Sequence, residues 1–181
     1  LESVRLFPDR AHLVGAYGLG KCQRIIALLR REGYNAPIYL HGAMVALCEL
    51  YEAHGVNLGE LRPATELNKD NADGCIVLCP PSALLDRWSR RFTTPAGEPI
   101  TAMASGWMRV RARAKQKGIE LPLVISDHAD WPELLQTIRE VNPQEVWITH
   151  GAEEALLYWC EQQGSKAKAL ALHGLDEEDA A

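Results

Sequence analysis

The sequence lacks any apolar run of the roughly 18 residues that a membrane-spanning helix requires. It also shows no signal peptide, so we expect no membrane partner. Its composition does not resemble that of a disordered chain, because 47% of its 181 residues are hydrophobic and 24% are charged. A chain of this length can bury a proper core, and it predicts one domain, or one domain and part of another.

The sequence lacks an even set of cysteines, since its five cysteines are an odd number scattered through apolar runs. This favours reduced core thiols in a cytoplasmic protein over a disulfide framework. Cys75 and Cys79 lie four residues apart, but the apolar residues between them indicate a buried strand. Because same-face residues alternate along a strand, a structural core explains this pair better than a zinc knuckle.

Positive charge is in deficit, with 19 Lys and Arg against 24 Asp and Glu and a net charge of -5. An acidic total argues against a nucleic-acid coat protein, although it does not report local patches. Residues 87–113 are locally basic, with six arginines. That stretch is compatible with a surface that faces a polyanion and equally with solvated helix faces.

Strand and helix patterns alternate along the whole chain, which predicts an α/β fold with a mostly parallel sheet flanked by helices. Residues 57–74 are polar and turn-rich and predict a surface excursion. We expect strands at 12–17, 37–41, 74–79, 100–105, from 121, 145–150 and 168–172, and helices at 21–32, 42–54, 82–88, 109–117, 130–141 and 152–163.

Two apolar strands end in histidine. Residues 121–131 (LPLVISDHADW) carry an apolar run into His128, and residues 145–151 repeat the pattern with His150. In a parallel sheet both imidazoles lie on the carboxyl edge, where ligands bind. Such a pair suits proton transfer or metal binding, whereas a lone strand-end histidine is usually just a surface residue. His41 also ends a strand and is a minor candidate.

Asp130 has two interpretations. It lies at the end of the first histidine motif, and Glu133 follows three residues later at the start of a helical pattern. This spacing is typical of a capping box, so Asp130 is either a helix cap or part of the site.

Residues 15–21 fit the phosphate-loop pattern G-x-x-x-x-G-K, but Cys22 stands where Ser or Thr should follow. A thiol is a poor ligand for Mg²⁺, which prefers oxygen. A glycine-rich turn leading into a packed helix is the favoured interpretation, and a P-loop-like nucleotide-binding module remains an alternative.

These stretches together resemble a known family. Ser126-Asp127-His128-Ala129-Asp130 and Thr149-His150-Gly151 resemble the second and third histidine motifs of the β-CASP branch of metallo-β-lactamase-fold nucleases. GAYGLGKCQRIIALL (15–29) resembles the strand, turn and helix that open the β-CASP insert. ASGWMRVR (104–111) resembles the small-residue loop near the scissile phosphate. The likeness is greatest to bacterial ligase-associated DNA exonucleases and covers nearly the whole chain.

The resemblance implies a role for each matched residue. His150 corresponds to a ligand of the second of two zinc ions, and His128 to the group that protonates the leaving oxygen of the cleaved phosphodiester. Ser126 and the Ser105-Gly106 loop correspond to phosphate contacts. Lys21, Arg24 and Arg109 could steer the DNA backbone, or could be ordinary surface charge. A DNA ligase and a helicase are the implied partners in DNA repair.

The chain also departs from the family pattern. The principal metal motif, His-x-His-x-Asp-His, is absent from the sequence, and so are the other metal-binding residues that precede it in the family. The sequence also begins without Met. We therefore expect a C-terminal fragment that lacks an N-terminal metallo-β-lactamase segment, with the β-CASP domain at residues 1–117 and the closing segment of the αββα domain at 118–181.

The resulting prediction is part of a zinc-dependent DNA exonuclease, a hydrolase that is inactive as this fragment alone. The rival within the family is an RNA-processing β-CASP ribonuclease, because phosphodiester hydrolysis is common to both.

Overall fold

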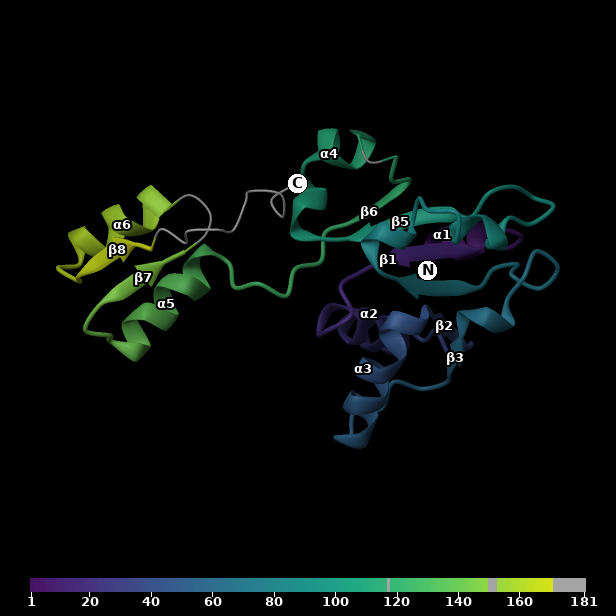
Figure 1. Ribbon diagram of the computed structural model, residues 1–181, viewed down its shortest axis with the longest axis horizontal. Coiled ribbons are helices and arrows are strands. Elements are labelled where there is room, and N and C mark those ends of the chain that lie inside the picture. Colours follow the sequence, from purple (N-terminus) through teal and green to yellow (C-terminus); the bar gives the residue numbers. More distant parts are fainter. Residues whose placement is uncertain (117, 150–152, 171–181) are drawn as a thin grey trace. The chain divides into compact units, whose positions relative to one another are not determined.

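The computed structural model describes residues 1–116, 118–149 and 153–170. The chain divides into two compact units, Leu1–Asp127 and His128–Ala181, which are described separately below (Figure 1). Among the described residues, no helix is both long and apolar enough to cross a membrane.

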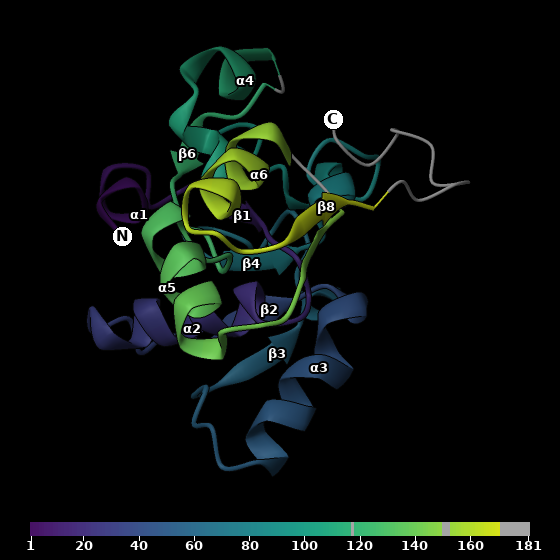
Figure 2. The same cartoon turned by 90° about the vertical axis from the view of Figure 1, so that its left-hand side faces the viewer.

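The first unit is built on a six-stranded sheet of order β3-β2-β4-β1-β5-β6, in which every pair of neighbours is parallel. Figure 2 labels β6, β1, β4, β2 and β3 in this order from near the top to near the bottom. The strands are β1 (His12–Gly15), β2 (Ile38–Leu40), β3 (Leu61–Pro63), β4 (Ile76–Cys79), β5 (Ile100–Ala104) and β6 (Leu121–Leu123).

Four α-helices belong to this unit: α1 (Glu2–Leu6), α2 (Lys21–Arg31), α3 (Gly42–Ala53) and α4 (Arg111–Gln116). Ile25 and Ile26 are buried on α2 and Met44 on α3, so both helices pack their apolar sides on one face of the sheet. Gly33 follows α2 with a φ of +83°, a conformation that glycine adopts without strain, and the helix ends there.

The opposite face of the sheet is covered by short 3₁₀ segments and loops. Leu13 and Val77 point to this face and pack with Leu84 and Phe92 in a second apolar cluster. The segments are η1 (Ala64–Glu66), η2 (Pro81–Ala83), η3 (Ser89–Phe92) and η4 (Gly106–Arg109). Because both faces are covered, strands β1, β2, β4 and β5 are buried along their whole length, as parallel strands usually are.

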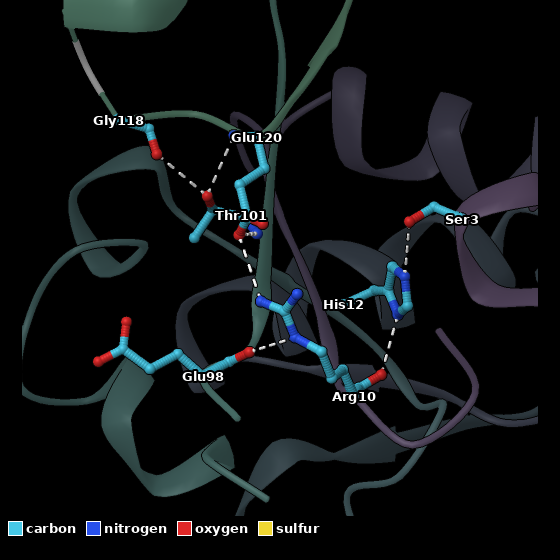
Figure 3. Close-up of polar contacts among 7 residues, drawn as sticks. All are labelled: Ser3, Arg10, His12, Glu98, Thr101, Gly118 and Glu120. Carbon is cyan, nitrogen blue, oxygen red and sulfur yellow. Dashed lines mark hydrogen bonds and ion pairs between the residues drawn. The ribbon is translucent and has the colours of Figure 1, made fainter. Parts of the chain in front are cut away.

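Polar contacts tie the beginnings of the strands together at the amino edge of the sheet (Figure 3). The Arg10 guanidinium donates to the Glu98 carbonyl at 2.7 Å and lies 3.6 Å from the Glu120 carboxylate. The Thr101 hydroxyl donates to the Gly118 carbonyl at 3.3 Å. These contacts join the segments that lead into β1, β5 and β6.

The second unit contains helix α5 (Trp131–Val141), strand β7 (Val146–Ile148), helix α6 (Glu153–Gln162) and strand β8 (Ala167–Ala169). The two strands are parallel and form a sheet of their own. Leu135, Ile148, Leu156 and Cys160 form its buried apolar cluster.

The fold class predicted from the sequence is confirmed, since the strands are parallel and helices flank them. Two local predictions were wrong. Ser82 lies inside the 3₁₀ segment η2 instead of capping an α-helix, and the strands expected to bring His128 and His150 to one sheet edge, β6 and β7, belong to different sheets. The 57–74 segment is mostly exposed, as expected of a surface excursion, but it also contains β3 and η1. The proposed domain boundary at residue 117 stays a prediction.

Candidate functional site

The carboxyl edge of the first sheet brings together most of the residues predicted to contact phosphate. Lys21 begins α2 after the loop that follows β1, Ser105 follows β5, and Ser126 lies just beyond β6. Because β1, β5 and β6 are parallel members of the same sheet, their carboxyl ends meet at one edge. Loops from three strands therefore contribute to one site.

Lys21 is held in this site by an ion pair. Its Nζ lies 2.9 Å from Asp127 Oδ1, and its side chain is only 3% exposed. The ammonium group also lies over the Tyr17 ring, 5.1 Å from the ring centroid. A buried ammonium group needs such an anionic partner, because desolvation without one is costly.

Arg24 lies one turn further along α2 and is exposed. Its guanidinium donates a hydrogen bond of 3.1 Å to the carbonyl of Ser126. Two successive residues beyond β6, Ser126 and Asp127, are thus both held by the first turn of α2.

The Ser105-Gly106 loop approaches the same segment. The Ser105 hydroxyl accepts a hydrogen bond of 3.3 Å from the Trp107 N–H and caps η4, while the Ser105 N–H donates to the Leu123 carbonyl at 3.1 Å. A Cβ atom on Gly106 would lie 3.5 Å from the Ser126 side chain. Ser105 itself is buried, and the capping bond uses only a lone pair of its hydroxyl oxygen.

Arg109 is the last residue of η4 and is exposed. His128 is exposed and begins the second unit, directly after Asp127. His150 lies outside the described residues. Asp130 is confirmed as the N-cap of α5, with a capping box: its Oδ1 accepts from the Glu133 N–H at 2.9 Å, and Glu133 Oε2 accepts from the Asp130 N–H at 3.0 Å.

His41 has a structural role at the end of β2. Its Nδ1 accepts a hydrogen bond of 3.1 Å from the Ala43 N–H and caps α3. Its ring packs edge-on against Trp88, with centroids 4.7 Å apart. Because Nδ1 accepts, the proton of the neutral ring lies on Nε2.

Packing favours a small residue at Gly15, the last residue of β1. A Cβ atom there would come within 2.4 Å of Leu84 Cδ1, so a larger residue would displace the Leu84 side chain. Cys22 is fully buried, with its Sγ 4.0 Å from that of Cys48. A buried thiol cannot serve as the magnesium-ligating group of a phosphate loop.

The residues that the structure describes do not supply a zinc site. In residues 1–116, 118–149 and 153–170, no three His, Cys, Asp or Glu side chains lie close enough together to hold a metal ion. A zinc site normally takes at least three protein ligands.

The partners of Lys21 were not predicted from the sequence. Lys21 follows β1 and Asp127 follows β6, and β5 lies between these two strands in the sheet. The positions of the two residues in the sequence therefore do not indicate a contact. Gln23 was also missed: it is buried, and its amide donates to the Gly18 carbonyl at 2.9 Å, which holds the loop after β1 against α2.

Part of the chain matches a known protein family. Residues 108–167 match the model of a family described as the Zn-dependent metallo-hydrolase RNA specificity domain. The match supports the metallo-β-lactamase/β-CASP family. It runs from η4 to the start of β8 and includes both His128 and His150.

The chain is also similar to a curated protein named "Probable DNA ligase" from Opitutus terrae. The two are 29% identical over 162 residues, which is 90% of this chain and 15% of that protein. The chain therefore spans about 15% of the length of this relative. No solved structure matches the chain.

Proposed function

We propose that this chain is part of a zinc-dependent DNA exonuclease that hydrolyses phosphodiester bonds in cytoplasmic DNA repair. The observation that carries the proposal is the family match over residues 108–167, because the matched segment contains the two strand-end histidines. Similarity to a protein named as a DNA ligase supports DNA as the substrate and a ligase as a partner. A helicase partner follows only from the resemblance.

In this proposal His128 donates a proton to the leaving oxygen of the cleaved phosphodiester. An imidazole suits this role because histidine titrates near neutral pH. The backbone and hydroxyl of the Ser105-Gly106 loop, together with Ser126, contact phosphate. Arg24 and Arg109 are exposed cations that attract the DNA backbone.

Zinc would activate water and stabilise negative charge in the complete protein. His150 is the proposed ligand from this chain. The described residues hold no group of three possible ligands, and we propose that the other ligands come from the N-terminal metallo-β-lactamase segment of the complete protein. We therefore expect the isolated chain to cleave nothing and to bind zinc weakly.

A full-length protein with His128→Asn tests the proposal. We expect turnover of a DNA substrate to fall about 100-fold or more, with DNA affinity nearly unchanged, because general-acid catalysis is worth about 10² to 10⁴ in rate. His54→Asn is the matched control, since His54 is exposed at the end of α3 and bonds only locally, to the Leu50 carbonyl at 2.8 Å. Equal turnover in the His128 variant and the control would refute the proposal.

An RNA-processing β-CASP ribonuclease is the second candidate. The description of the matched family as an RNA specificity domain favours it. Digestion of DNA and RNA of the same sequence by the full-length protein separates the two. Faster cleavage of RNA would replace the DNA exonuclease proposal with this one.

A nucleotide-binding P-loop is disfavoured by the burial of Cys22 and by the ion pair that engages Lys21. Specific ATP binding by the purified chain would reverse that judgement.

A further inference from the structure

The first turn of α2 holds the segment that leads from the first unit to His128. Lys21 pairs with the Asp127 side chain at 2.9 Å, and Arg24 donates to the Ser126 carbonyl at 3.1 Å. A Cβ atom on Gly20 would lie 3.7 Å from Asp127 Oδ2, so the turn before α2 also lies against this segment. His128 follows Asp127 directly in the chain.

Lys21 differs from an exposed surface cation that is available to bind phosphate. Its side chain is 3% exposed, whereas that of Arg31 at the other end of the same helix is 73% exposed. The Lys21 ammonium is placed between an anion and the Tyr17 ring. To reach a phosphate it would have to leave both partners.

The segment that Lys21 holds has little regular structure of its own. Strand β6 ends at Leu123 and α5 begins at Trp131, so residues 124–130 form no helix or strand. A short irregular segment is fixed only by the contacts that its residues make. The ion pair and the Arg24 hydrogen bond act on the two residues before His128.

We propose that Lys21 is a positioning residue that acts through Asp127, with Arg24 acting through Ser126, to fix the backbone from which the His128 imidazole reaches the substrate. The inference rests on the proposed function, because it assigns Lys21 to the placement of the proton donor. It replaces steering of the DNA backbone as the role of Lys21. Proton donation is sensitive to such placement, since a displacement of about 1 Å can cost roughly 100-fold in rate.

The test compares Lys21→Met, Lys21→Arg and Asp127→Asn in the full-length protein. We expect Lys21→Met and Asp127→Asn each to lower kcat about 10- to 100-fold, with KM and DNA affinity changed less than about twofold. Lys21→Arg keeps the charge and should recover most of the activity. Arg31→Met is the matched control, because it removes an exposed cation from the same helix and should leave kcat unchanged.

A phosphate contact at Lys21 predicts a different pattern. Lys21→Met would then weaken DNA binding and reduce its salt dependence by about one counterion, while Asp127→Asn would free the ammonium and leave binding equal or tighter. That pattern would overturn the inference.

Amide hydrogen exchange of residues 124–130 gives a readout that does not need activity. We expect exchange there to be roughly tenfold faster in Lys21→Met and Asp127→Asn than in the unsubstituted protein and in Arg31→Met. Unchanged exchange would overturn the inference whether or not the protein is a nuclease. If the unsubstituted full-length protein cleaves no nucleic acid, the proposed function fails, and the exchange comparison still decides whether Lys21 holds this segment.

Discussion

Lys21 and Asp127 form an ion pair whose two members differ in exposure: the lysine side chain is 3% exposed and the aspartate 31%. The two residues are far apart in the sequence, and the pair closes the carboxyl edge of the sheet between α2 and the segment after β6. The loss in stability of the first unit is therefore expected to depend on which partner is removed.

Asp127→Asn should destabilise the first unit more than Lys21→Met. The asparagine variant leaves a buried ammonium group without its anion, whereas the methionine variant leaves a carboxylate that water can reach. We expect a loss of about 2 kcal/mol for Asp127→Asn and less than about 1 kcal/mol for Lys21→Met, because the aspartate is partly solvated and its pairing is screened. Urea denaturation measures both, and the reverse order would contradict the burial of Lys21.

Asp130→Ala should lower the stability of the second unit by about 1 kcal/mol, because it removes an N-cap from α5. Asp130→Ser should retain most of that stability, since serine also caps helices well. Chemical denaturation of the two variants and amide exchange in α5 are the measurements. A loss of turnover in full-length Asp130→Ser, with stability retained, would instead assign Asp130 to the site.

Acidification should destabilise the first unit through His12. Burial lowers the pKa of His12 below its ordinary value of 6.5, while the ring bonds to Ser3 and to the Arg10 carbonyl (Figure 3). Because the unfolded chain then binds a proton more readily than the folded one, the contribution is intact above pH 6.5 and is lost as pH falls from 6.5 toward the folded pKa.

Urea midpoints measured between pH 7.5 and pH 5 should therefore fall less steeply in a His12→Gln variant than in the unsubstituted protein. His54→Gln is the control, since His54 is exposed at the end of α3. Parallel pH profiles for the unsubstituted protein and His12→Gln would contradict this role of His12.

The cysteines should differ sharply in reactivity toward an alkylating reagent. Burial raises the pKa of the Cys79 thiol to about 12, and Cys22 and Cys48 are also buried, whereas Cys75 is partly accessible. We expect Cys75 to be modified first in the folded protein at pH 8, and all five to be modified in urea. Protection of both Cys75 and Cys79 by added zinc would restore the zinc-knuckle interpretation.

The hydrophobic periodicity of the sequence predicted most helices and strands, because apolar residues recur with the period of the helix or strand whose face they bury. They missed β3, whose residues are intermediate or exposed and end in Pro63, so it has no apolar alternation to detect. They placed a helix after Pro81 where the chain forms only 3₁₀ segments. There Leu84 packs against Gly15 of β1, a tertiary contact that local propensity does not reveal.

The sequence predicted that the candidate site lies after strand ends, but it did not predict the contacts within the site. Parallel strands bring their carboxyl ends to one edge of a sheet, where ligands bind. His128 and His150 were expected to share such an edge, whereas β6 and β7 belong to different sheets. The pairing of Lys21 with Asp127 depends on the order of the strands, in which β1 lies between β4 and β5. Sequence patterns locate most of the strands but do not fix that order.

The central position of β1 also determines when this unit can fold during synthesis. β1 pairs on one side with β4 at residues 76–79 and on the other with β5 at residues 100–103. β1 is made before both of its partners and must therefore wait for them to leave the ribosome, which takes about 4 to 18 s at usual rates of translation. During that delay the residues of His12–Gly15, which are buried in the folded unit, remain exposed to solvent.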